Sequence, residues 1–141
     1  MVLPLAAAPL LTAPNAAAED NPDWHGKCST RISPTEANYV DGWANIHDEG
    51  ANWQVWNIYA NVRNAGGSEI RSDNLVTVEV ANGSRIIASH KFEKIVNADI
   101  TLTADVYPPQ LVPKGQLSIR THAITGIDIW PKLCDGVSLV F

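Results

Sequence analysis

The chain contains no extended basic run and no segment with the apolar period of an amphipathic helix. It carries 10 Lys and Arg against 15 Asp and Glu, which gives a net charge of −5. A nucleic-acid-binding surface needs a stripe of positive charge that neutralises phosphates, so we expect no nucleic-acid partner. The missing helical period argues against a helical fold.

Catalytic patterns are missing as well. Ser29, Ser68 and Ser118 stand in no nucleophile-elbow motif, and no recognisable motif pairs two carboxylates for general acid and base catalysis. The only two cysteines, Cys28 and Cys134, have neither the spacing of a zinc motif nor an adjacent base. We therefore predict a protein that is not an enzyme and that uses no cofactor.

Possible metal ligands are scattered along the chain. The histidines stand singly, at His25, His47, His90 and His122. A zinc or copper site would require three of them to converge in space, and a lone histidine on a strand is more simply one that is hydrogen-bonded at the core edge. We predict no metal site. A calcium-binding loop at Asp41, Asp48 and Glu49 stays open as an alternative, although the EF-hand spacing is missing.

The first eighteen residues have the pattern of a secretory leader. Residues 1–18 are apolar and uncharged, and the small residues Ala16–Ala18 precede Glu19, as a signal-peptidase site requires. The prolines of this segment disfavour a membrane span. The leader lacks an opening Lys or Arg, which leaves open a start upstream of Met1. We predict a secreted protein that continues with a flexible tail over residues 19–27.

Cys28 and Cys134 lie near the two ends of the remaining chain. In an oxidising compartment, an even pair in an otherwise cysteine-free domain predicts one disulfide bond. Closure of a loop of roughly a hundred residues stabilises a fold by up to about 4.7 kcal/mol in the chain-entropy model. The bond would join the first strand to the last.

Side chains alternate between apolar and polar with a period of two, which is typical of half-buried strands. Turn residues separate the strands, with Asn82-Gly83 as a hairpin signal and Pro108-Pro109 as the expected end of a strand. Over residues 28–141 we predict an all-β, Ig-like two-sheet antiparallel sandwich with one disulfide. The expected strands are residues 56–63, 75–80, 85–92, 99–107, 117–123 and 137–141, with less regular strands near 31–32 and 38–46.

Tryptophan is abundant relative to the other aromatics, with five Trp against three Tyr and two Phe. Indole faces stack on the apolar faces of sugar rings, so exposed tryptophans favour glycan binding, whereas buried ones only pack the core. The phase that Trp56 shares with Val62 predicts that it is buried. We expect Trp43, Trp53 and Trp130 at the surface.

Five residues form the candidate ligand site. Trp53 and Trp43 would stack on a sugar, while polar side chains of the strand after Trp56 would bind hydroxyl groups: Asn57, Asn61 and Arg63. An ordinary solvated strand face is the alternative for these three polar residues.

The stretch Trp53–Gly66, WQVWNIYANVRNAG, and the turn Val112–Gly115 lie between the two cysteines. In these features the chain resembles the family 2 type of cellulose-binding modules from secreted glycosidases. The resemblance implies a β-sandwich that binds polysaccharide through a planar tryptophan strip. The chain departs from the family at Asn74 and over residues 85–97, where the expected tryptophans are missing, and this favours a soluble glycan or no glycan over crystalline cellulose.

Two function classes follow. The first is a secreted protein-interaction domain that uses loops or an exposed edge strand. The alternative is a carbohydrate-binding module for a polysaccharide or oligosaccharide. The expected partner is thus a protein or a glycan, with no membrane span.

Overall fold

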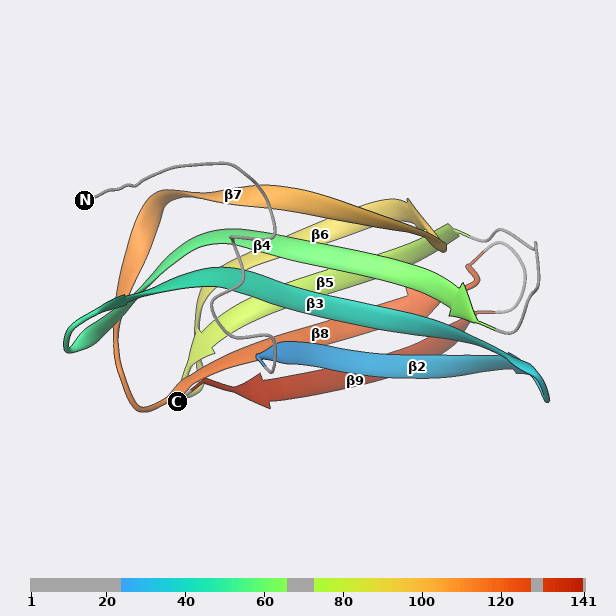
Figure 1. Cartoon of the computed structure of the whole chain (residues 1–141), viewed down its shortest axis with the longest axis horizontal. Coiled ribbons are helices and arrows are strands. Elements are labelled where there is room, and N and C mark those ends of the chain that lie inside the picture. The colour runs from blue at the N-terminus through green and yellow to red at the C-terminus, as the bar shows by residue number, and fades with distance from the viewer. Residues whose placement is uncertain (1–23, 66–72, 128–130, 141) are drawn as a thin grey trace.

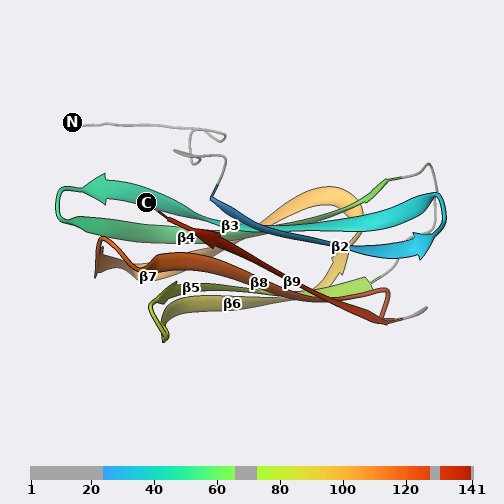
Figure 2. The same cartoon turned by 90° about the horizontal axis from the view of Figure 1, so that it is seen from below.

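The computed structural model describes residues 24–65, 73–127 and 131–140. These residues form eight strands in two antiparallel sheets of four, which lie as two layers (Figure 1, Figure 2). The strands are β2 (His25–Ser33), β3 (Glu36–Glu49), β4 (Asn52–Ala65), β5 (Asp73–Asn82), β6 (Arg85–Val96), β7 (Ala98–Pro113), β8 (Leu117–Thr125) and β9 (Lys132–Leu139). Sheet I has the order β2-β3-β4-β7, and sheet II has the order β6-β5-β8-β9. The predicted two-sheet antiparallel sandwich is confirmed. No helix in the described part of the chain is long and apolar enough to cross a bilayer.

The core lies between the sheets and follows the predicted alternation. In β5, Val76, Val78 and Val80 are fully buried. In β8, Ile119 pairs with Val80, and Ile119 and Leu117 are buried in the same core. Branched aliphatic side chains pack well on a pleated surface, so burial of this row stabilises the pairing of β5 with β8.

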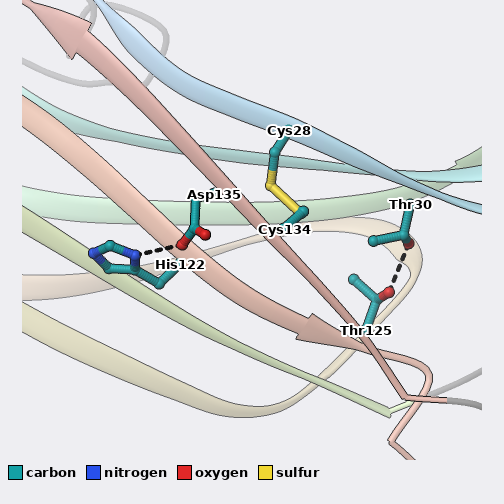
Figure 3. Close-up of a disulfide and its surroundings, with 6 residues drawn as sticks. All are labelled: Cys28, Thr30, His122, Thr125, Cys134 and Asp135. Atoms are coloured by element: carbon teal, nitrogen blue, oxygen red, sulfur yellow. Dashed lines mark hydrogen bonds and ion pairs between the residues drawn. A yellow bond between two sulfur atoms is a disulfide. The ribbon is translucent and has the colours of Figure 1, made fainter.

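The disulfide joins the two sheets at one edge of the sandwich. Cys28 of β2 is bonded to Cys134 of β9, with Cα atoms 5.8 Å apart (Figure 3). β2 and β9 are edge strands of sheets I and II, and they are the first and last strands that the structure describes, so the predicted link is confirmed. Beside it, the hydroxyls of Thr30 and Thr125 share a buried hydrogen bond of 2.6 Å.

Glycines allow the two sheets to approach closely at this edge. A Cβ on Gly136 of β9 would overlap the Lys27 backbone, including its nitrogen at 2.7 Å. A Cβ on Gly26 would lie 2.7 Å from the Thr121 hydroxyl oxygen, and a Cβ on Gly42 would overlap the same atom. Thr121 therefore fills the space that side chains at Gly26 and Gly42 would need.

Three details differ from the sequence-based expectations. The strand β2 includes His25, Gly26 and Lys27, which the sequence analysis assigned to a tail over residues 19–27. The prolines Pro108 and Pro109 do not end a strand. β7 runs through them because it is an edge strand, where a missing N–H leaves no ladder partner unpaired.

The third difference is the hairpin between β5 and β6, whose two-residue loop is Gly83-Ser84, since Asn82 pairs with Arg85. Gly83 has a φ of 62°, and positive φ at the first central position suits a type II′ turn. The hairpin itself was predicted correctly, one residue out of register. The predicted leader over residues 1–18 lies outside the described residues.

Replacing both cysteines tests the covalent link. We expect Cys28→Ser with Cys134→Ser to lower the free energy of unfolding by about 2–5 kcal/mol, because the unfolded chain regains the entropy of a long loop. Urea denaturation of the parent protein and the double variant measures this difference. An unchanged denaturation midpoint would show that the bond does not contribute to stability.

The close contact at Gly136 gives a second stability test. We expect Gly136→Ala to cost about 3 kcal/mol, at the upper end for overpacking, because the new methyl group meets backbone atoms that cannot rotate away. The control is Gly50→Ala, because Gly50 has open space around its Cβ position but a φ of 73°. We expect this substitution to cost only about 1 kcal/mol, as backbone strain. Thermal unfolding of both variants compares the two costs, and equal losses would contradict the close packing.

Candidate functional site

The described tryptophans occupy different positions from those expected. Trp53 is 6% exposed and packs edge-on against Trp24, with ring centroids 5.1 Å apart. Trp56 is 42% exposed, and its indole N–H donates to Gln54. Exposure of Trp53 and burial of Trp56 were therefore wrong expectations. Trp130 lies outside the described residues.

A β-bulge causes this exchange. The pairing of β4 with β7 shifts between Val55 and Asn57, so the inward phase changes at Trp56. Before the bulge Trp53 and Val55 point inward, and after it Ile58 does. One extra residue in a strand reverses the faces of all residues on one side of it.

Trp43 lies in a row of stacked rings on the outer face of sheet I. Its ring is stacked with the His25 ring of β2 at 4.7 Å and with the Tyr59 ring of β4 at 5.3 Å. Because β2 and β4 flank β3, the two neighbours cover opposite faces of the indole. Trp43 therefore presents a ring edge to solvent, and no indole face remains for a sugar. Burial and the negative charge of Asp105 raise the pKa of the Tyr59 phenol, which keeps it a neutral hydroxyl.

Next to this row the outer face of sheet I is hollowed. The depression has a volume of about 420 Å³, within the range of small-molecule sites. Two outward positions from each of three neighbouring strands line it, together with Cys28 and Val40: Lys27 and Ser29 of β2, Tyr39 and Asp41 of β3, and Asn61 and Arg63 of β4.

The register explains the shape of the depression. Lys27, Asp41 and Asn61 form one cross-strand row, and Ser29, Tyr39 and Arg63 form the next. Along each strand a short side chain is next to a long one: Ser29 to Lys27, Asp41 to Tyr39, and Asn61 to Arg63. The short side chains leave space between the long ones, and this space is the depression. The groups that line it include hydrogen-bond donors and acceptors as well as one aromatic ring.

Neighbouring groups hold several of these side chains in place. The Asp41 carboxylate is 2.6 Å from Nδ1 of His25. The Asn61 amide N–H donates to Asp99 at 3.1 Å. The Arg63 guanidinium carbon lies 4.6 Å from the centroid of the Tyr39 ring, a cation–π contact. Anchored side chains lose less freedom when a ligand binds.

Of the five residues predicted to bind a ligand, the structure brings four to one face. Trp43, Asn57, Asn61 and Arg63 are outward residues of β3 and β4 in sheet I, and two of them, Asn61 and Arg63, line the depression. Asn57 lies four residues before Asn61 on β4 and donates to Asp105 at 2.7 Å. Trp53 points into the core instead.

Four of the six outward lining residues were not predicted from the sequence: Lys27, Ser29, Tyr39 and Asp41. Alternation along β3 gives a signal for Tyr39 and Asp41, which share a face with Trp43, although Gly42 interrupts the apolar pattern. Nothing in the sequence sets β2 beside β3 in this register, so Lys27 and Ser29 had no comparable signal.

The outer face of sheet II carries a histidine between two carboxylates. Nδ1 of His122 is 2.6 Å from Asp135 of β9, and its Nε2 is 3.1 Å from Glu79 of β5 (Figure 3 shows the first contact). Hydrogen bonds that the protonated ring donates, first to Asp135 and then to Glu79, raise the pKa of His122. Its two ring nitrogens point to opposite sides, so these contacts cannot converge on one metal ion.

No group of three or more His, Cys, Asp or Glu residues in residues 24–65, 73–127 and 131–140 is arranged to hold a metal ion. Asp48, one of the acids considered for calcium, is paired with Lys114 at 2.5 Å.

Comparison with protein-family models, with curated proteins and with solved structures finds no match for this chain.

The cross-strand contacts of His122 make stability depend on pH. Because the folded-state pKa is raised, their contribution is complete below about pH 6.5 and is lost as the pH rises through the folded-state value. We expect the effect to stay below about 1 kcal/mol, since this side chain is 47% exposed. The melting temperature of His122→Gln, compared with that of the parent between pH 5 and pH 9, checks this. An equal difference at both ends of the range would contradict it.

Proposed function

We propose that the protein is a secreted, non-catalytic binding protein that holds a carbohydrate in the depression on the outer face of sheet I. The single observation that carries this proposal is the grouping of outward side chains from β2, β3 and β4 around one hollow. The bond between Cys28 and Cys134 supports a location outside the reducing cytoplasm.

The lining suits a ligand rich in hydroxyl groups. Sugars need donors and acceptors within a small area, and Ser29, Asp41 and Asn61 supply both. Tyr39, which is 42% exposed, adds an aromatic ring to the lining of the hollow. A few fixed polar groups beside an apolar ring are typical of small-ligand sites.

The proposed site differs from a planar cellulose-binding strip. Both faces of Trp43 are covered by other rings and Trp53 is buried, so neither indole offers the flat platform that crystalline cellulose requires. A hollow of this size favours a short stretch of a soluble glycan. We expect micromolar to millimolar affinity, because few stacking contacts contribute.

A protein partner is the second candidate, and one observation favours it. The outer side of the edge strand β9 exposes three large aliphatic side chains, with Leu133 76%, Val137 62% and Leu139 58% exposed. Edge strands with exposed apolar residues are recognised by other proteins through strand addition. This surface lies in the other sheet, so the two candidates can be separated by mutation.

Glycan arrays followed by calorimetry on single variants test the carbohydrate proposal. We expect Tyr39→Ala and Asn61→Ala each to weaken binding about tenfold, which is about 1.4 kcal/mol, through loss of ring contact or of a hydrogen bond. The control is Thr103→Ala, an exposed position on the same face in β7 that lies outside the hollow.

Loss of binding in the two site variants but not in the control supports the proposal. If the three variants bind a glycan like the parent, the hollow is not the binding site. If no glycan binds, the carbohydrate function is wrong, and the protein partner at β9 takes its place.

A further inference from the structure

We propose that the sugar bound in the depression carries a carboxylate group, as a uronic acid unit does. This inference rests on the proposed carbohydrate function and narrows the ligand to an acidic saccharide. It is carried by two cations, Lys27 and Arg63, that line the hollow.

Both cations are available to a ligand. Lys27 and Arg63 are exposed, and neither forms an ion pair in the part of the chain that the structure describes. They lie on β2 and β4, the strands on either side of β3, and in adjacent cross-strand rows, so their backbones are about 12 Å apart. On a protein with a net charge of −5, two such cations around one hollow provide a local anion-binding surface.

Arg63 is suited to a carboxylate in particular. Its guanidinium lies over the Tyr39 ring, which limits the positions that this long side chain can take. A guanidinium uses its face for such a ring contact, while its N–H groups lie in its plane and stay free to donate. Paired N–H donors match the two oxygens of a carboxylate, so Arg63 can bind that group in a bidentate manner.

Asp41 distinguishes a sugar acid from a simple anion. Its carboxylate lines the hollow from β3, the strand between those of the two cations, and would repel a second negative charge placed beside it. One of its oxygens is already 2.6 Å from His25, so Asp41 is held in place as a hydrogen-bond acceptor. The ligand therefore needs a hydroxyl group opposite Asp41 and its negative charge toward Lys27 or Arg63.

Asn61 adds a second acceptor. Its amide nitrogen donates to Asp99 at 3.1 Å, and the carbonyl oxygen of the same planar amide points the other way. Acceptors for hydroxyl groups beside donors for a carboxylate describe a uronic acid, whose ring bears both. A neutral sugar would leave the two cations without a partner, and an acidic peptide would leave the acceptors without hydroxyl donors.

Calorimetry with matched oligosaccharides tests the inference. Oligogalacturonate is titrated into the full chain, and the same oligosaccharide with its carboxylates reduced to alcohols serves as the neutral counterpart. We expect the acidic form to bind at least tenfold more tightly at 50 mM salt. That preference should shrink at 500 mM salt, where exposed charges are screened. A sulfated neutral oligosaccharide distinguishes a carboxylate from any anion.

Variants connect the preference to this hollow. Arg63→Met and Lys27→Met should each reduce affinity for the acidic form about tenfold, and should reduce it more for the acidic form than for the neutral form. Lys91→Met is the matched control, since it removes an exposed cation from β6 in the other sheet and should have no effect.

The outcomes separate this inference from the proposed function. If the neutral form binds as well as the acidic form, the acidic ligand is wrong while the carbohydrate function stands. If the sulfated oligosaccharide binds as tightly as the uronate, the selectivity for carboxylate is wrong. Equal losses of affinity in Lys91→Met and in the two site variants would show that the acidic ligand does not bind in this hollow. If neither form of the oligosaccharide binds, and no glycan of the array binds, the carbohydrate function is wrong as well.

Discussion

The close approach of β2 to β9 is the constraint on which the rest of the sandwich depends. Gly136 brings the β9 backbone against Lys27, and the disulfide of the adjoining residues Cys28 and Cys134 fixes that contact covalently. Once β2 is held there, its pairing with β3 and the pairing of β3 with β4 set which side chains stand together on the outer face. The hollow lined by Lys27, Asp41 and Asn61 therefore follows from a packing contact on the inner face of the same strands.

Much of the fold could be predicted because the core of β5 and β8 follows a plain period of two. Val76, Val78 and Val80 alternate with polar residues, and so do Leu117 and Ile119. The sequence therefore predicted which face of each strand is buried. The positions of the tryptophans could not, because one bulge reversed the phase of β4, and a bulge leaves no mark in an apolar pattern.

The candidate site was predicted only in part, for a related reason. Asn61 and Arg63 lie on one strand, where alternation places them on the same face. The side chains that line the other side of the hollow come from β2. The register between β2 and β3 depends on tertiary contacts such as that of Gly26 with Thr121. Pairing across strands is a property of the whole sandwich, so Lys27 and Ser29 entered the site only with the structure.

The position of the disulfide also has a mechanical meaning. A pulling force applied outside Cys28 and Cys134 runs through the covalent bond, because the cysteines lie in the first and last described strands. The hydrogen bonds between strands then carry no load, and the hollow keeps its shape under tension. Reduction of the bond would release roughly 350 Å of extensible chain between the cysteines. If the two ends of the chain are attached to different structures, the disulfide makes the connection between them stiff, and its reduction makes that connection extensible.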